Sequence, residues 1–147
     1  MPFKSNSFDL VWNAGVIEHF YPGQQLKCMT EMLRVCKSGG LVITLNPYAK
    51  AFIYRWAKSI AQKNGRWSAG YEKPLRTLKP IAKRINNSQF VKEFSRGFLF
   101  QLYFLKYLFN FPPLIRSYSL LNELINKTLM FFNNFSGYLL VTVLRRK

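Results

Sequence analysis

The sequence is short of acidic residues, histidine and cysteine. Its 147 residues hold six Asp and Glu, one His and two Cys, against 22 Lys and Arg. A single histidine without clustered carboxylates offers too few ligands for a metal site. The spacing of Cys28 and Cys36 fits neither a zinc site nor a disulfide framework, so we interpret both as reduced core residues. The scattered serines form no recognisable pair of nucleophile and base for hydrolysis.

The sequence also lacks a glycine-rich turn and a long apolar run. No G-x-G-x-x-G follows a strand-like segment; Gly39-Gly40 precedes one instead, and cannot present a helix N-terminus to a ligand. The aromatic run Phe98–Phe111 covers 14 residues before Pro112-Pro113, short of the ~20 that span a bilayer. Met1–Asn6 has no apolar run and is therefore no signal peptide.

The most informative segment that is present covers residues 7–47. Phe8–Val16 is almost continuously apolar, which predicts a strand buried on both faces. A helix should follow, with an apolar stripe made by Leu26, Met29, Leu33 and Cys36. Gly39-Gly40 is expected to cap this helix, and Leu41–Leu45 to form a second strand. Strand, helix and strand in this order predict a parallel pair joined by a right-handed crossover.

The segment after this unit predicts helices and one outer strand. Asn46 is expected to cap a helix that Pro47 opens, with an apolar stripe made by Ala49, Phe52, Ile53, Trp56 and Ile60. Thr77 is a plausible cap for a short helix that ends at Ile85. Phe90–Ser95 alternates weakly and is expected to form an outer strand.

The C-terminal part is rich in apolar and aromatic residues. Phe98–Phe111 and Leu114–Phe132 each predict a helix, and Tyr138–Leu144 predicts a strand buried on both faces. The length fits one α/β domain over 1–147. Within it we expect a basic helical and loop insertion at 48–97 and apolar helices at 98–132.

Two segments carry a resemblance to a known family. FDLVWNAGVIEHF has Phe-Asp and two apolar residues at the start of a strand, and Glu18-His19 after it. EMLRVCKSGGLVITLNP leads through Lys37-Ser38-Gly39-Gly40 into the next strand. Both resemble the class I S-adenosylmethionine-dependent methyltransferases of type 11, where they surround the fourth and fifth strands. The family's usual Lys-Pro-Gly-Gly has Ser38 in place of proline here.

The resemblance implies a partial Rossmann-like sheet made of the fourth to seventh strands, with helices on both faces. The expected order is fourth, fifth, last, sixth, with the last strand antiparallel. The family's glycine-rich turn and ribose-binding acid would belong to three strand–helix units upstream. We therefore expect a C-terminal half, from a truncated or split chain, that is inactive by itself.

The resemblance also implies a site for S-adenosylmethionine and a methyl acceptor. The residues expected to line the cofactor's methionine part are Asn13, Ala14, Gly15 and Val16. Asn46 and Pro47 are expected on the acceptor side. His19, paired with Glu18, could take a proton from an acceptor hydroxyl or amine. The alternative is that Glu18 and His19 only cap their loop or pin the following helix.

The implied function is methyl transfer to a small-molecule or lipid-like acceptor. A separately encoded N-terminal half, or self-association, could complete the fold. The net charge of +16 leaves two alternatives open: a membrane-surface or interaction module that uses Phe98–Phe111, and an RNA-binding or RNA-modifying protein that uses 48–97 with its aromatic residues. Nucleic acid is the less favoured partner. We expect a cytoplasmic protein, and peripheral contact with a membrane is the alternative that stays open.

Overall fold

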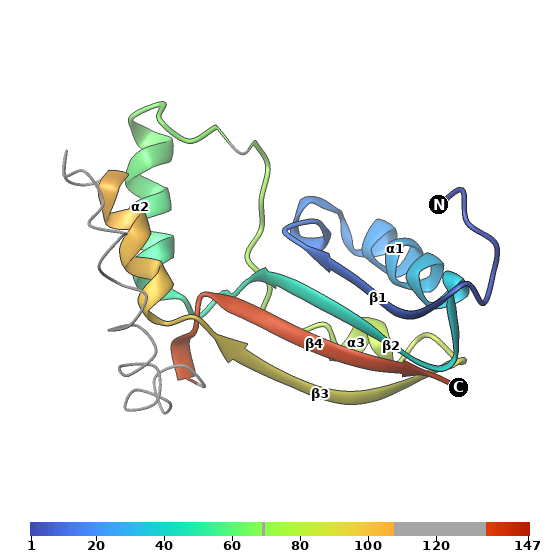
Figure 1. Cartoon of the computed structure of the whole chain (residues 1–147). Coiled ribbons are helices and arrows are strands. Elements are labelled where there is room, and N and C mark those ends of the chain that lie inside the picture. The colour runs from blue at the N-terminus through green and yellow to red at the C-terminus, as the bar shows by residue number, and fades with distance from the viewer. Residues whose placement is uncertain (69, 108–134) are drawn as a thin grey trace. The chain divides into compact units, whose positions relative to one another are not determined.

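The computed structural model describes residues 1–68, 70–107 and 135–147. Its elements, with η for a 3₁₀ helix, are β1 (Phe8–Ala14), η1 (Ile17–His19), α1 (Pro22–Val35), β2 (Cys36–Pro47), α2 (Phe52–Lys63), α3 (Lys79–Ala82), β3 (Ser88–Arg96), η2 (Leu99–Tyr107) and β4 (Leu139–Arg146) (Figure 1). The chain folds into two compact units. The first contains Met1–Pro47, Lys73–Phe94 and Leu140–Lys147, and the second contains Tyr48–Glu72 and Ser95–Leu139.

The first unit is built on a four-stranded sheet in the order β1-β2-β4-β3. β1 and β2 are parallel, with Leu10 opposite Leu41 and Ala14 opposite Leu45. β4 runs opposite to its two neighbours (Figure 1). The predicted order of fourth, fifth, last and sixth strand is therefore confirmed. Because β4 has a neighbour on each side, its central residues are buried, as its apolar sequence predicted.

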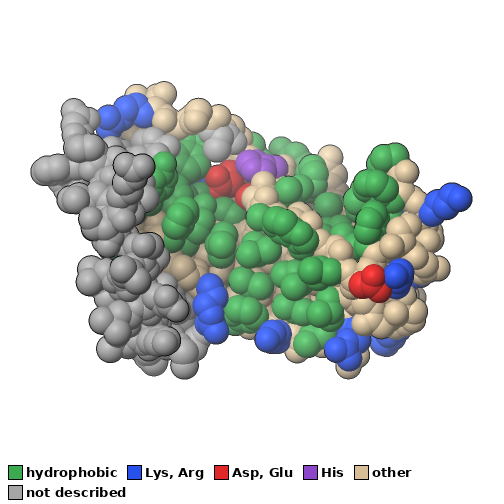
Figure 2. All heavy atoms as spheres, viewed as in Figure 1, with side chains coloured by type: hydrophobic (Ala, Val, Ile, Leu, Met, Phe, Trp, Pro, Cys, Tyr) green, Lys and Arg blue, Asp and Glu red, His purple; other side chains and the backbone are tan. Residues whose placement is uncertain are grey.

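β1 is an edge strand, and the prediction that it is buried on both faces is wrong. Leu10 and Trp12 are 50% and 64% exposed. The opposite face is covered by α1, whose Met29 and Leu33 are fully buried. Figure 2 shows hydrophobic side chains gathered over the strands on the viewed face of the sheet. Within the described residues, β1 thus leaves one apolar face and one hydrogen-bonding edge open.

β2 starts directly after α1 instead of after the two glycines. Cys36 is its first residue, so the predictions that Cys36 belongs to the helix and that Gly39-Gly40 caps it are wrong. Gly39 has a φ of +77°, which favours glycine. A Cβ on Gly40 would lie 2.7 Å from the Asp9 carbonyl oxygen and from Cys36 Sγ. The glycines therefore make a bulge, across which the register changes from Phe8 opposite Cys36 to Leu10 opposite Leu41.

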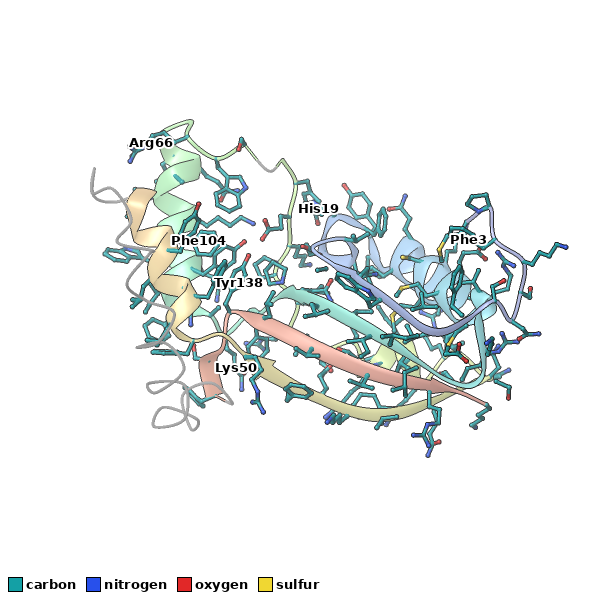
Figure 3. All side chains as sticks on the ribbon, viewed as in Figure 1. Phe3, His19, Lys50, Arg66, Phe104 and Tyr138 are labelled. Atoms are coloured by element: carbon teal, nitrogen blue, oxygen red, sulfur yellow. The ribbon has the colours of Figure 1, made fainter. Side chains whose placement is uncertain are left out.

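α2 begins later than predicted and buries a different face. Asn46 and Pro47 end β2, and Ala51 is the N-cap of α2. The side chains that α2 buries are Tyr54, Ala57, Lys58 and Ala61. The predicted stripe instead leaves Phe52 and Trp56 exposed. Tyr54 carries the contact with η2, since its ring centroid lies 4.7 Å from that of Phe104 (Figure 3).

The remaining predictions concern short or aromatic segments. The predicted short helix is present as α3, but Leu78 is its N-cap instead of Thr77, and it ends at Ala82 instead of Ile85. Thr77 Oγ1 accepts a hydrogen bond from Lys79 N at 3.1 Å. β3 contains the predicted outer strand. In its described part, Phe98–Phe111 forms the 3₁₀ helix η2. The predicted helix Leu114–Phe132 lies outside the described residues. None of the described helices is long and apolar enough to cross a membrane.

Candidate functional site

The carboxyl ends of β1 and β2 meet at one edge of the sheet. Gly15 N donates a hydrogen bond to Leu45 O at 2.9 Å, just beyond the last paired residues. This contact brings the predicted residues Asn13–Val16 next to Asn46-Pro47. In open parallel sheets, ligands bind beyond the carboxyl ends of the strands. The structure therefore puts both groups of predicted residues where such a site is expected.

Glu18 and His19 lie in the turn that leaves β1. Gly15 has a φ of +69° and turns the chain, and a Cβ added to it would lie 3.5 Å from Glu18 Oε1. Glu18 is buried, whereas His19 is partly exposed, with its Nε2 3.9 Å from Glu18 Oε1. Figure 2 shows the purple imidazole at the surface. The pair is thus a buried carboxylate beside an accessible imidazole.

Gln25 of α1 holds this turn in place, and sequence reasoning missed it. The Gln25 side chain is buried, and its Nε2 donates to Ile17 O at 3.2 Å and to Phe20 O at 3.0 Å. These carbonyls flank Glu18 and His19. The sequence offered one signal for this role, a glutamine beside the apolar stripe of a helix. A side-chain amide at such a position is buried and needs a hydrogen-bonding partner.

The segment after residue 72 holds the same edge through its backbone. Lys73 N donates to Glu18 O at 3.1 Å, and Leu75 N donates to Pro47 O at 2.9 Å. One short stretch thus bonds to the turn after β1 and to the end of β2. It fixes the two predicted groups by main-chain contacts, which the sequence did not reveal.

The covered face of the sheet becomes polar toward this edge. Val42, Thr44 and Asn46 alternate along β2 and are all fully buried, and Asn13 lies opposite Thr44. Asn13 Nδ2 contacts Met32 Sδ at 3.1 Å. Among the described residues, Asn13 Oδ1, Thr44 Oγ1 and both amide atoms of Asn46 have no hydrogen-bond partner. Buried polar atoms are usually paired, so these four atoms are exceptions that a hydrogen-bonding group from outside the described residues could satisfy.

The cysteines are not part of this site. Burial raises the pKa of the Cys36 thiol and of the Cys28 thiol, so both stay protonated and poorly reactive near neutral pH. Both are free thiols. In the described part of the chain, no three His, Cys, Asp or Glu side chains gather as a metal site would require.

The segment that forms this edge also matches a protein family. Residues 1–44 match the family model of the methyltransferase domain. The resemblance to class I methyltransferases is confirmed. The matched segment contains β1, η1, α1 and most of β2, and so includes the turn with Glu18 and His19.

Solved structures share this methyltransferase fold at low sequence identity. A protein of Pyrococcus horikoshii OT3 has a TM-score of 0.58 and 17% identity over 100% of this chain and 55% of its own. A chain from the complex of the Haloferax volcanii Trm112 methyltransferase activator with a methyltransferase has a TM-score of 0.55 and 16% identity. The match covers 99% of this chain and 57% of that one. The [4+2]-cyclase SpnF has a TM-score of 0.51 and 15% identity, over 99% of this chain and 53% of its own.

These likenesses establish the methyltransferase fold and no more. The chain spans little more than half the length of each of the three structures. One of them is named as a cyclase, so the fold does not determine the reaction. Among curated proteins, none matches this sequence.

Proposed function

We propose that this chain supplies the methionine-binding and acceptor side of an S-adenosylmethionine-dependent methyltransferase that acts on a small-molecule or lipid-like acceptor. The observation that carries the proposal is the meeting of Asn13–Val16, Glu18-His19 and Asn46-Pro47 at one sheet edge. That edge lies largely within the segment that matches the methyltransferase domain. Its buried amides and its imidazole supply the two functions needed there, holding a charged ligand and accepting a proton.

The unpaired amides suit the amino-acid part of the cofactor. When bound, S-adenosylmethionine supplies an activated methyl group on a sulfonium. Asn46, which the resemblance placed on the acceptor side, is assigned to the cofactor because it lies beside the Asn13–Val16 strand end. It offers a donor and an acceptor, and Asn13 offers an acceptor, as an ammonium and a carboxylate require. Gly15 has no side chain, so it lets a ligand approach the backbone closely. Ala14 and Val16 complete the strand end beside it.

His19 is the group that would accept a proton from the methyl acceptor. Its exposed imidazole can meet a hydroxyl or amine, and the buried Glu18 carboxylate would stabilise the imidazolium that forms. Positioning carries most of the rate of such a transfer, because the methyl donor is already activated. Gln25 and Lys73 contribute by fixing the turn that carries both side chains.

The open side of β1 supports a proposal about a partner. A partner strand that pairs in parallel with β1 would bond to the open backbone groups along its edge. Helices of that partner would cover Leu10 and Trp12. A separately encoded N-terminal half fits both requirements, and a second copy of this chain is the alternative. The partner would also supply the glycine-rich turn that these 147 residues do not contain.

The role of His19 is tested with this chain assembled with a methyltransferase N-terminal half. We expect His19→Ala to lower turnover roughly tenfold or more, because a general base is lost. Tyr21→Ala is the matched control, an exposed ring in the same turn. Turnover within about twofold of the wild type, under ~0.5 kcal/mol of barrier, would make His19 a structural residue.

A further inference from the structure

The helix α2 turns its largest apolar side chains outward. Phe52 and Trp56 lie one turn apart and are 58% and 57% exposed. At 3.6 residues per turn, Arg55, Ser59 and Lys63 share their side of the helix. All five are exposed, and we refer to them as the outer face of α2. A helix with only a core to cover would bury Phe52 and Trp56 as α2 buries Tyr54.

A buried ion pair fixes this orientation. Lys58 is on the opposite side of α2, where its Nζ lies 3.1 Å from Glu72 Oε1 and donates to Glu72 O at 2.9 Å. The same ammonium lies 5.0 Å from the centroid of the Trp67 ring. Turning the aromatic side inward would pull Lys58 and Glu72 apart and leave a buried charge unpaired, which is costly. The outward position of Phe52 and Trp56 is therefore a fixed feature of the second unit.

Among the described residues of the second unit, the outer face is positively charged and carries no acidic side chain. Arg55 and Lys63 lie on it, and Figure 3 shows Lys50 and Arg66 at the two ends of α2. Residues 48–71 contain no Asp or Glu, and the following Glu72 faces Lys58. This surface therefore complements an anionic partner, and exposed aromatic rings among the cations add an apolar contribution.

An exposed aromatic side chain extends this surface at the start of α2. The Phe135 ring is 60% exposed, and Lys50 Nζ lies 5.7 Å from its centroid. Ser136 Oγ donates to Lys50 O at 2.6 Å and fixes Phe135 there. Cations next to exposed aromatic rings are the composition of helices that lie in a membrane interface.

We propose that the outer face of α2 binds an anionic lipid surface. Phe52 and Trp56 enter the headgroup region, and Arg55 and Lys63 contact lipid phosphates while their aliphatic stems follow the rings. Single-stranded nucleic acid is less well matched, because bases stack on aromatic platforms within a charged groove, whereas these rings project from a helix. The sequence-based membrane hypothesis used Phe98–Phe111, but Phe104 of that segment is buried against Tyr54.

The test is flotation of the full chain with vesicles of phosphatidylcholine, with and without phosphatidylserine. Flotation separates membrane binding from aggregation, because aggregates do not rise. We expect binding that requires phosphatidylserine and falls with salt. Phe52→Ala/Trp56→Ala and Arg55→Glu/Lys63→Glu should each lower the partition coefficient roughly tenfold or more. The matched controls, Trp12→Ala and Lys83→Glu/Arg84→Glu, carry the same kinds of change at exposed residues of the first unit and should bind as wild type.

Three results would overturn the proposal. The first is equal loss of binding in the control variants, which would indicate unspecific attraction by the net charge. The second is tight binding of single-stranded RNA that depends on the outer face, without flotation. The third is no flotation together with a lower melting temperature for Phe52→Ala/Trp56→Ala, which would show that the chain itself covers these rings. None of these measurements depends on methyl transfer.

Discussion

Gln25 is the residue that most directly controls the geometry of the turn after β1. One buried and one partly buried hydrogen bond from its Nε2 hold the carbonyls of Ile17 and Phe20. We expect Gln25→Ala to lower the free energy of unfolding by about 1–3 kcal/mol, because both carbonyls lose a buried donor. Urea unfolding measures this change. Gln24→Ala is the control, since Gln24 is exposed and accepts one bond from Tyr21 N; equal losses in the two variants would contradict this role.

The Glu31–Arg34 pair predicts how stability depends on acid. The Arg34 guanidinium, with Nη2 2.7 Å from Glu31 Oε1, and the Met1 ammonium, 2.8 Å from the same oxygen, together lower the pKa of this carboxyl from 4.5 to about 2. Because the folded-state pKa of Glu31 lies below its unfolded value, the ionised carboxylate stabilises the fold at pH values above about 4.5. This contribution is lost as the pH falls from about 4.5 to about 2. Glu31→Gln should flatten the acid limb of a melting-temperature profile in that window. An unchanged slope would show that the pair does not contribute.

The candidate site was partly predictable at the level of residues. Asn13–Val16 and Asn46-Pro47 follow two apolar segments of a parallel pair, and such ends share an edge, so their meeting followed from the sequence pattern. Gln25 and the Lys73 backbone did not follow from it. Gln25 acts through carbonyls in a turn, and Lys73 acts through its own backbone amide. Neither contact produces a periodic pattern of apolar residues in the sequence.

At the scale of elements, the open edge of β1 predicts self-association of the isolated chain. Within the part of the chain that the structure describes, β1 has no neighbour on its outer side, and no lysine or proline interrupts its apolar run. We expect concentration-dependent association in analytical ultracentrifugation, reduced by Leu10→Lys, which puts a charge on the open face. Val91→Lys on β3, the opposite edge strand, is the matched control. A stable wild-type monomer that Leu10→Lys leaves unchanged would contradict this view of β1.

The elements themselves show what periodicity can and cannot predict. The existence of β1, α1, β2, α2, β3 and β4 followed from apolar patterns and turn residues. The burial of β1 did not, because an apolar run looks the same in an internal strand and in an edge strand with an open face. The prediction of which face α2 buries was also wrong. The buried Lys58–Glu72 pair is an exception to the rule that charged residues face the solvent.

At the scale of the whole molecule, we propose that the sheet edge formed by β1 and β2 holds the methionine part of S-adenosylmethionine. The chain carries this edge but no glycine-rich turn for the ribose and adenine. We therefore expect it to bind the cofactor more weakly than micromolar, since each ~1.4 kcal/mol of lost contact lowers affinity tenfold. Weak binding at a defined place is the expected signature of half a site.

Nuclear magnetic resonance tests this claim most directly, because it locates weak binding residue by residue. The ¹⁵N-labelled Leu10→Lys chain, used to limit association, is titrated with S-adenosylmethionine into the millimolar range. We predict shifts of the backbone amides of Gly15, Glu18 and His19 and of the Asn46 side-chain amide, while β3 stays unchanged; Asn46→Ala should weaken the Gly15 shift. No shift at this edge, shifts confined to other elements, or micromolar binding by the chain alone would contradict the account.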